Sequence, residues 1–408
     1  MSNIRLKMRP AFQKLEGGLF ASVAKADVGS AYSELAAQGI DLMGWADPFF
    51  PDLSIPTHVM DAAIDALKSG FPSHYTMPIG NVDLKKVIAE KLLRKNGIRV
   101  NPERNILITP GSDSGLLYAM MPFINPEDEV MTLDPSYPSN FLNAEILYGK
   151  TVPIPIYEEE GYCINVQEFE KRLTQRTKMV LLTNPNNPTT TVFSRDDLLA
   201  LSKFIVENDL VCVVDQAFED IVFEGRECVS MATLPGMWER TVSVFSMSKG
   251  MGLSGFRVGY LVADDVIMDV LFGGAVNVIG ATNTMAQIAA IAAFEDYSFI
   301  EEYNRKHDQR RKFAYELFNS IPGVSMLMPE SGFYSWINIS RLGDSTEISQ
   351  YLIREARVAC NDGKAYGNQG AGHLRLIHGC YWDEERAYKA LKRVKAALFK
   401  RAKEIDHE

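Results

Sequence analysis

The sequence predicts an α/β protein, with a mostly parallel central sheet flanked by helices and a smaller α+β domain beside it. Three observations lead to this fold class. The chain has 408 residues, too many for one simple core. From about residue 105, short apolar runs alternate with helical patterns. These runs are nearly continuous in hydrophobicity, as expected of strands buried on both faces of a parallel sheet.

The first part of the chain is expected to form an arm and helices before the sheet begins. Residues 1–40 resemble an arm with an alanine-rich helix at 21–37, and a short strand near 40–43 runs into a proline-rich loop. Amphipathic patterns predict helices at 58–69 and 83–96. The sheet is then built from strands at 106–109, 129–133, 178–183, 210–214, 242–245 and 259–262, with helices at 116–123, 137–148 and 195–208 between them.

The pattern changes after about residue 295. A long charged helix at 298–318 precedes short strands at 332–339 and 373–378, and a helix at 384–403 closes the chain. We interpret the long helix as a structural strut with a solvated charged face. We therefore predict a large domain at 46–295 and a small one made of residues 1–45 and 296–408.

Composition excludes several classes of function. With 42 basic and 52 acidic residues the net charge is −10, which argues against a nucleic-acid or anionic-membrane surface. The five cysteines are odd in number and lack C-x-x-C spacing, so we expect neither disulfides nor a metal site. The N-terminus has no apolar segment typical of a signal peptide, and polar residues interrupt the apolar stretch at 266–294. We expect a cytoplasmic protein without a membrane span.

Small and polar residues follow most of the predicted strands. In open parallel sheets, ligands bind beyond the carboxyl ends of the strands, where these residues would gather. The residues at such positions are Gly111, Ser112, Asp113, Tyr137, Asn187, Asp215 and Lys249. Their shared location predicts a ligand site at this edge of the sheet.

Lys249 follows a predicted strand and lies among serines and glycines, eight residues before Arg257. A lone loop lysine is ordinarily a solvated surface residue. Here, however, Arg257 offers a two-pronged guanidinium for a phosphate, and Ser246 and Ser248 add hydroxyl donors. Residues 111–113 form a glycine turn into a helix, whose free N–H groups also favour an anion, although such turns are common as plain helix caps.

Asp215 ends a strand of apolar residues, where a carboxylate needs a cationic partner to stay charged. It could simply cap the following turn, but a protonated ring nitrogen would also serve. An amine that forms an imine, a phosphate cradle and an acid for a pyridinium nitrogen are together the requirements of pyridoxal 5'-phosphate.

These residues stand in segments that resemble a known family. S-M-S-K-G-M-G-L-S-G-F-R-V-G-Y is similar to the cofactor-lysine signature of the class I/II aminotransferases, which are fold-type I pyridoxal-phosphate enzymes. N-P-N-N-P, V-V-D-Q-A-F and D-P-S-Y-P-S resemble further motifs of that family, and the likeness covers about residues 30–400. The resemblance implies a fold-type I transferase that moves an amino group from an L-amino acid to a 2-oxo acid through a Schiff base on Lys249.

The resemblance also implies roles for the matched residues. Asp215 would pair with the ring nitrogen, Tyr137 would stack on the ring, and Asn187 would bind the ring hydroxyl and help to hold the substrate carboxylate. The full set of implied cofactor-binding residues is Tyr75, Gly111, Ser112, Asp113, Tyr137, Asn187, Asp215, Phe218, Ser246, Ser248, Lys249 and Arg257.

Substrate and partner roles follow from the same resemblance. Arg375 in H-L-R-L matches the arginine that forks the substrate α-carboxylate, which Asn187 would also contact. Trp45 and Ala46 would border the substrate. Tyr75 in Y-T-M-P-I-G matches a tyrosine that reaches the phosphate of the neighbouring subunit, so the resemblance implies a homodimer with shared active sites.

Four positions depart from the family pattern. Phe218 replaces a tyrosine that would donate a hydrogen bond to the cofactor's ring oxygen. Ala46, preceded by Trp45, replaces the glycine of a G-E-P segment. Thr190 replaces a turn glycine, and Asn140 stands where many relatives have a second tyrosine. Together these changes indicate a divergent branch with a substrate of its own.

The sequence leaves alternatives open. The same residues would serve a C–S (β-elimination) lyase or an amino-acid decarboxylase of the same fold, because those reactions share the first step. A regulatory protein that only binds the cofactor would need a basic helix-turn-helix extension, and the N-terminal arm is too short for one. Trp45, Phe49 and Phe50 suggest an apolar entrance for the substrate side chain, but they could equally be packing residues.

Overall fold

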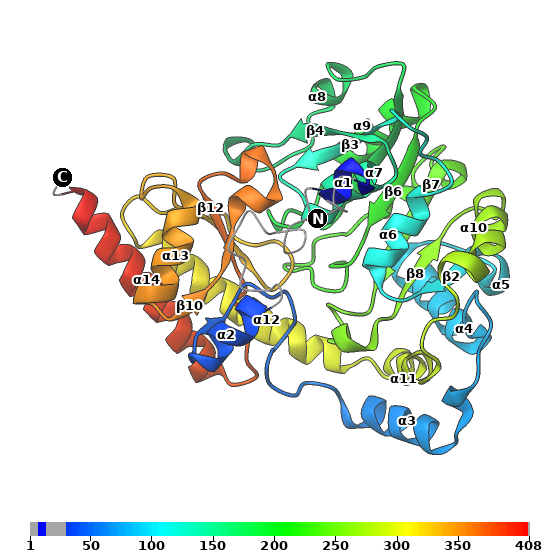
Figure 1. Cartoon of the computed structure of the whole chain (residues 1–408), viewed down its shortest axis with the longest axis horizontal. Coiled ribbons are helices and arrows are strands. Elements are labelled where there is room, and N and C mark those ends of the chain that lie inside the picture. Colours follow the sequence, from blue (N-terminus) through cyan, green and yellow to red (C-terminus); the bar gives the residue numbers. More distant parts are fainter. Residues whose placement is uncertain (1–6, 14–29, 407–408) are drawn as a thin grey trace.

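A seven-stranded sheet forms the centre of the structure. The computed structural model describes residues 7–13 and 30–406, and Figure 1 shows the sheet in its larger part. The strand order is β2-β8-β7-β6-β5-β3-β4, in which β8 pairs antiparallel with β2 and β7 and every other pair is parallel. The strands are β2 (Ile106–Thr109), β3 (Glu129–Asp134), β4 (Lys150–Pro155), β5 (Thr177–Thr183), β6 (Val211–Asp215), β7 (Thr241–Ser246) and β8 (Gly259–Val262).

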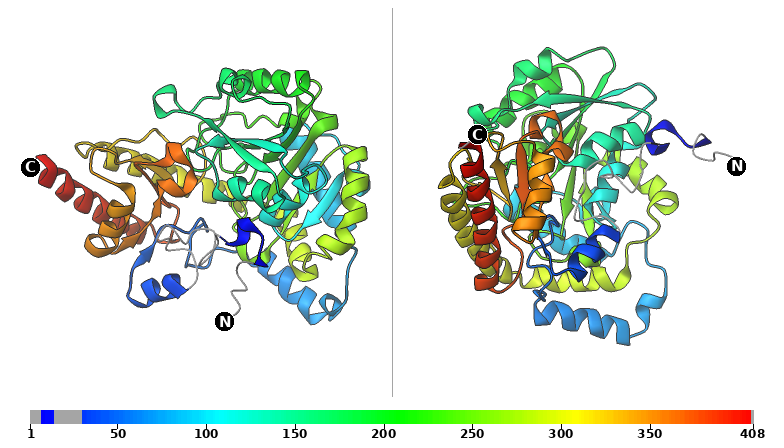
Figure 2. Two further views of the ribbon diagram at one scale, coloured as in Figure 1. Left: turned by 45° about the horizontal axis from the view of Figure 1, so that its top comes forward. Right: turned by 60° about the vertical axis from the view of Figure 1, so that its left-hand side comes forward.

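Helices cover both faces of this sheet, as Figure 2 shows. Successive strand residues point to opposite faces, so β7 buries Val244 against α6 and α10 but Phe245 against α4 and α11. The helices of this part are α3 (Thr57–Lys68), α4 (Val82–Lys91, continued by a π-helical turn to Asn96), α5 (Pro102–Asn105), α6 (Ser112–Met120), α7 (Pro138–Ile146), α8 (Val166–Glu170), α9 (Arg195–Glu207), α10 (Asp265–Val278) and α11 (Thr284–Glu295). The predicted α/β class with a mostly parallel sheet is confirmed.

A second, smaller set of strands lies beside the large sheet. β11 (Asn361–Asp362), β12 (His373–Leu376) and β9 (Ser335–Asn338) form an antiparallel sheet, and β1 (Asp41–Leu42) pairs parallel with β10 (Val358–Ala359). The surrounding helices are α2 (Ser30–Ala37), α12 (Phe299–Asn319), α13 (Ser345–Glu355) and α14 (Glu384–Asp406), and α1 (Pro10–Gln13) lies near α7. Residues 21–29 of the helix predicted at 21–37 fall outside the described residues. The proposed division at residues 46 and 296 stays a prediction.

Two differences from the predicted elements have clear local causes. Helix α6 begins at Ser112, four residues before its predicted start, because Gly111 at φ +86° turns the chain directly into the helix. Strand β4 was not predicted, because Pro153 and Pro155 interrupt the continuous apolar run by which the other strands were recognised. It is an edge strand of the sheet, where missing N–H groups are tolerated. Helix α13 was also not predicted.

The long helix α12 has the expected exposed charged face, which includes Arg305 and Lys312, but part of its charge is buried. Arg310 and Arg311 on this helix are 0% and 1% exposed. The Arg310 guanidinium donates to the carbonyl oxygens of Cys380 and Tyr381 at 2.7 and 2.8 Å and to the carboxylate of Glu384 at 2.8 Å. The charge pattern along the helix did not indicate these buried arginines, because a segment distant in sequence supplies the acceptors that make burial of the charge tolerable.

Phe49 connects the loop at 45–52 to the same region. Its ring is fully buried, stacks on His307 with centroids 4.8 Å apart, and lies 5.6 Å from Arg310 Cζ. Its N–H donates to the Gly379 carbonyl at 2.8 Å, and its φ is +62°, a rare value for an aromatic residue. Phe49 is thus a packing residue, one of the two alternatives that the sequence left open, and it fixes the loop that carries Trp45.

The described residues contain neither a helix that could cross a membrane nor a cluster that could hold a metal ion. None of their helices combines the length and the apolar character that crossing a membrane requires. No group of three or more histidine, cysteine, aspartate or glutamate side chains among them is arranged to hold a metal ion.

We predict that Arg310→Met lowers the free energy of unfolding by about 2–4 kcal/mol, because it leaves two loop carbonyls without their donor and Glu384 with Lys306 alone. Arg305→Met, on the exposed face of the same helix, should change it by no more than about 0.5 kcal/mol. Denaturant unfolding measures both values. Equal effects of the two substitutions would contradict the role given to Arg310.

Candidate functional site

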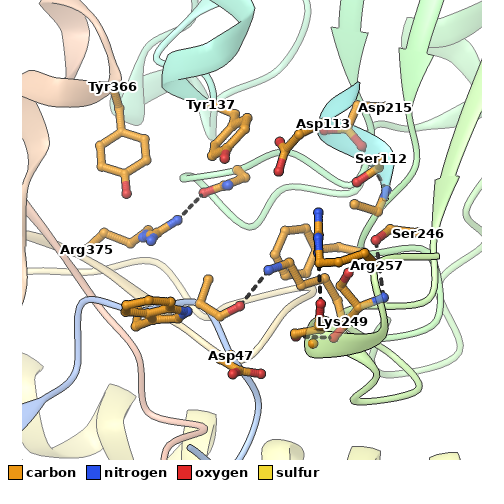
Figure 3. A pocket seen from close by; sticks show the side chains of 18 residues that line it. Asp47, Ser112, Asp113, Tyr137, Asp215, Ser246, Lys249, Arg257, Tyr366 and Arg375 are labelled. Atoms are coloured by element: carbon orange, nitrogen blue, oxygen red, sulfur yellow. Dashed lines mark hydrogen bonds between the residues drawn. The ribbon is translucent and has the colours of Figure 1, made fainter. Parts of the chain in front are cut away.

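A pocket of about 450 Å³ opens at the carboxyl ends of the parallel strands (Figure 3). Of the predicted site residues, all but Tyr75 and Gly111 line it. Those that do are Trp45, Ala46, Ser112, Asp113, Tyr137, Asn187, Asp215, Phe218, Ser246, Ser248, Lys249, Arg257 and Arg375. The sheet topology therefore brings together residues that are more than 300 positions apart in sequence.

Each strand end contributes one part of this pocket. Asp215 is the last residue of β6, and Lys249 lies in the loop that follows β7. Tyr137 precedes the first turn of α7 after β3, and Asn187 lies in the loop after β5. Arg375 comes from β12 of the small sheet, so the pocket lies between the two sheets. Ligands of α/β proteins commonly bind at such an edge.

Arg257 lies over the turn at Gly111. A Cβ atom at position 111 would be 2.2 Å from Arg257 Nη2, so only glycine leaves room for the guanidinium. Arg257 Nη1 donates to the Ser254 carbonyl at 2.8 Å, and the Ser248 N–H donates to Ser246 Oγ at 3.2 Å. The N-terminus of α6 has no side-chain cap. Together these groups form a cradle of donors and positive charge that suits a phosphate.

Lys249 reaches the middle of the pocket. Its Nζ donates to the Ala46 carbonyl at 2.5 Å, which links the loop after β7 to the loop after β1. Burial lowers the pKa of its ammonium, and the carboxylates of Asp113 and Asp47 oppose that change. A buried lysine with a lowered pKa holds more of its neutral amine, the form that attacks a carbonyl carbon.

Asp215 is buried at 5% exposure, and its Oδ1 accepts the N–H of Ala217 at 3.0 Å. Desolvation raises the pKa of this carboxyl from near 3.8 to about 7; Asp113 adds to the rise, whereas the Ala217 N–H and Lys249 reduce it. The side chain of Tyr137 lies beside Asp113 in Figure 3, and burial raises the pKa of its hydroxyl. An acid this strongly desolvated would bind a cationic ring nitrogen well.

Arg375 is 3% exposed, and its guanidinium contacts the side chain of Asn187. Its Nη1 donates to Asn187 Oδ1 at 3.0 Å, and its guanidinium carbon lies 4.9 Å from the centre of the Tyr366 ring. Arginine presents a planar set of donors that matches a carboxylate. The geometry therefore suits recognition of a small carboxylate on the side of the pocket opposite Arg257.

The sequence did not identify five residues that line the pocket, namely Asp47, Ala217, Ser254, Gly255 and Tyr366. Ser254 and Gly255 stand inside the Lys249–Arg257 segment, and Asp47 and Ala217 lie next to predicted site residues, so proximity in sequence could have found these four. Tyr366 had no such signal. It reaches the pocket from a loop between β11 and β12.

Three of the positions singled out in the sequence lie as follows. Phe218 lines the pocket and packs edge-on against Tyr334, with ring centroids 5.1 Å apart. Asn140 is fully buried and donates to Ser136 Oγ and Thr183 Oγ1 at 3.0 and 2.8 Å. Tyr75 is 99% exposed and lies in a separate surface hollow with Thr76 and Asn283, away from the pocket of its own chain.

The chain matches a model of known protein sequences over residues 41–394, and that model describes "Aminotransferase class I and II". Aromatic-amino-acid aminotransferase 2 of Thermococcus litoralis is 31% identical over 365 residues, 88% of this chain and 92% of that protein. An aspartate aminotransferase of Pyrococcus abyssi is 31% identical over 352 residues, 85% of this chain and 90% of that protein.

Solved structures give the same result for the fold. An aromatic aminotransferase from Pyrococcus horikoshii superposes with a TM-score of 0.84 at 30% identity, over 90% of this chain and 99% of that one. Aspartate aminotransferase from Thermus thermophilus with maleate gives 0.86 at 28% identity, over 96% and 99% of the two chains.

We predict that Asp215 makes the ligand-free protein less stable as the pH rises. The folded protein keeps this proton to about pH 7, whereas the unfolded chain loses it near pH 3.8. Because the folded state binds more protons in this window, the free energy of unfolding should fall by about 4 kcal/mol between pH 4 and pH 8, at ~1.4 kcal/mol per pH unit.

The measurement is denaturant unfolding across this pH range for the parent protein and for Asp215→Asn, which should lose that part of the pH dependence. Asp209→Asn is the matched control, because the Asp209 side chain is 95% exposed, and it should keep the dependence. Identical pH profiles for the parent and Asp215→Asn would refute the shift.

Proposed function

Because the chain belongs to the class I and II aminotransferase family and is an aminotransferase, we propose that it moves the amino group of an aromatic L-amino acid to a 2-oxo acid, with pyridoxal 5'-phosphate as cofactor. None of the four relatives named above is a lyase or a decarboxylase, so those alternatives lose support. The observation that carries the choice of substrate is the small number of basic side chains in the pocket.

Pyridoxal 5'-phosphate fits the residues of this pocket. Arg257 lies over a glycine where any side chain would close the cradle. Within the described residues, the one hydrogen bond to the Asp215 carboxylate comes from a backbone N–H, which leaves that acid available to a ring nitrogen. When bound, the cofactor supplies an aldehyde carbon for an amine and a ring that accepts electrons.

The residues would then divide the work among them. Arg257, Ser246, Ser248 and the N-terminus of α6 would bind the phosphate, and Asp215 would keep a proton on the ring nitrogen. Lys249 would hold the cofactor through its Nζ until a substrate amine replaces it. Burial lowers the pKa of its ammonium and so favours the neutral form, and the freed amine would then take the proton from the substrate Cα.

The side chain of the substrate is inferred from what the pocket lacks. Its basic lining residues in the described part of the chain are Lys249, Arg257 and Arg375, and each has a role above. Among the lining residues of this chain, none remains for the second carboxylate of aspartate. Trp45 at the edge of the pocket is 38% exposed and stacks on Phe50 at 6.1 Å, which offers a flat apolar surface to an aromatic ring.

The test is a half-reaction with single amino acids. With tyrosine or phenylalanine, we expect the absorbance of the bound cofactor to bleach and a 2-oxo acid to appear without ammonia. The ratio kcat/KM should exceed that for aspartate by about tenfold or more. Lys249→Ala should abolish the reaction. Release of ammonia or carbon dioxide would refute transamination, and preference for aspartate would refute the aromatic substrate.

Trp45→Ala provides the control for the side-chain assignment. It should raise KM for phenylalanine several-fold through lost contact with the ring, while KM for alanine, which has no ring, stays unchanged. Equal changes for the two amino acids would mean that Trp45 supports the loop rather than the substrate.

We also infer a homodimer in which Tyr75 completes the phosphate site of the partner subunit. Its exposure and its distance from the pocket of its own chain support this arrangement, as does the family. Tyr75→Ala and Lys249→Ala chains should each be inactive or weak. Mixed after partial unfolding, they should regain activity, because a hybrid dimer holds one complete site. Hybrids without recovered activity, or a monomer in light scattering, would contradict the shared site.

A further inference from the structure

Hydrogen bonds to other protein groups already use three of the five N–H groups of the Arg375 guanidinium. Nη1 donates to Asn187 Oδ1 at 3.0 Å, and Nη2 donates to the Gly44 carbonyl at 3.1 Å and to Asn361 Oδ1 at 2.7 Å. Each terminal nitrogen of arginine carries two N–H groups, so both of those on Nη2 are used. Nη1 keeps one N–H beyond its bond to Asn187, and Arg375 lines the pocket.

The hydrogen bond from Arg375 Nη2 to Asn361 Oδ1 is the shortest of the three. The position of Asn361 is fixed by strand pairing and by a second hydrogen bond. It lies on β11 directly opposite Arg375 on β12, and its side chain is fully buried. Its Oδ1 also accepts the hydroxyl of Tyr366 at 3.1 Å, while the Tyr366 ring lies against the guanidinium (Figure 3 shows Tyr366 and Arg375). The chain of contacts therefore runs from Tyr366 through Asn361 to Nη2 of Arg375.

The surroundings indicate that this contact has a functional purpose. The Nδ2 atom of Asn361 is buried without a hydrogen-bond partner in the described residues, a cost that an apolar side chain would avoid. A Cβ atom at Gly44 would lie 2.8 Å from that Nδ2, so the glycine permits the close approach. An asparagine kept here at a cost to stability contributes through its oxygen alone, which both partners use.

The amide is also neutral. An aspartate of the same shape would neutralise Arg375 and compete with an incoming carboxylate, whereas asparagine orients the guanidinium and leaves its charge intact. Nothing in the chain near residue 361 predicted this role, since the pairing across β11 and β12 creates it.

We propose that Asn361 and Tyr366 are positioning residues for recognition of the substrate carboxylate, holding Nη2 of Arg375 so that Nη1 and the full positive charge face the pocket. This inference rests on the proposed function, in which Arg375 binds the α-carboxylate. It adds two residues that act through Arg375. The role of Asn361 depends on its side chain being uncharged.

The experiment measures dissociation constants of two substrate fragments on the holoenzyme, from the absorbance change of the bound cofactor. One probe is 3-phenylpropionate, which has the carboxylate and no amine, and the other is phenethylamine, which has the amine and no carboxylate. Asn361→Asp should weaken 3-phenylpropionate at least tenfold and leave phenethylamine within about twofold.

A double-mutant cycle tests the order of the contacts. Tyr366→Phe should weaken 3-phenylpropionate a few-fold in the parent protein but have no further effect in Asn361→Leu, because the hydroxyl acts through the amide oxygen. Tyr118→Phe is the matched control. Its buried hydroxyl donates to the Leu271 carbonyl between α6 and α10, outside the pocket lining, so its loss should not change either constant.

The outcomes separate this inference from the proposed function. If Arg375→Lys weakens 3-phenylpropionate but Asn361→Asp does not, the positioning role is refuted and the proposed function stands. If Asn361→Asp weakens both probes equally, the substitution disturbs the whole pocket and the positioning role is again refuted. If Arg375→Lys also leaves 3-phenylpropionate unchanged, Arg375 is not the carboxylate receptor and that part of the proposed function fails.

Discussion

Parallel pairing of β5, β6 and β7 is the constraint on which the site depends. The register places Thr183 beside Asp215 and Asp215 beside Val244, so the polar residues that follow these strands meet at one edge. Because both faces of the sheet are covered by helices, the groups at this edge are largely withdrawn from water. Desolvation then raises the pKa of Asp215 and lowers that of Lys249, the two shifts on which the roles proposed for these residues depend.

A second requirement is that the small sheet be held against the large one. Lys249 Nζ bonds to the Ala46 carbonyl, and Arg375 bonds to Asn187, so each of these contacts crosses between the parts. Phe49 packs the loop that contains Ala46 against α12. On the same helix, Arg310 donates hydrogen bonds to backbone carbonyls of the segment that follows β12. The buried charge on α12 therefore stabilises the frame around the pocket.

Three of the four departures from the family pattern fall into two groups. Phe218, Trp45 and Ala46 line the pocket and can change its chemistry or its substrate. Asn140 is buried among Ser136 and Thr183, where it ties the start of α7 to β5 and does not reach the pocket. A substitution at a family position is therefore informative about substrate only where the fold exposes it to the cavity.

The sequence by itself determined all strands of the large sheet except β4, the class of fold and most of the pocket, because continuous apolar runs and the short polar segments after them are local signals. Lys249, Arg257 and Asp215 were identifiable for that reason. Only the tertiary structure decided that Tyr366 and Asn361 surround Arg375 and that Arg310 and Arg311 of α12 are buried. Those facts depend on strand pairing and on carbonyl groups from distant loops, and no local pattern of residues encodes such partners.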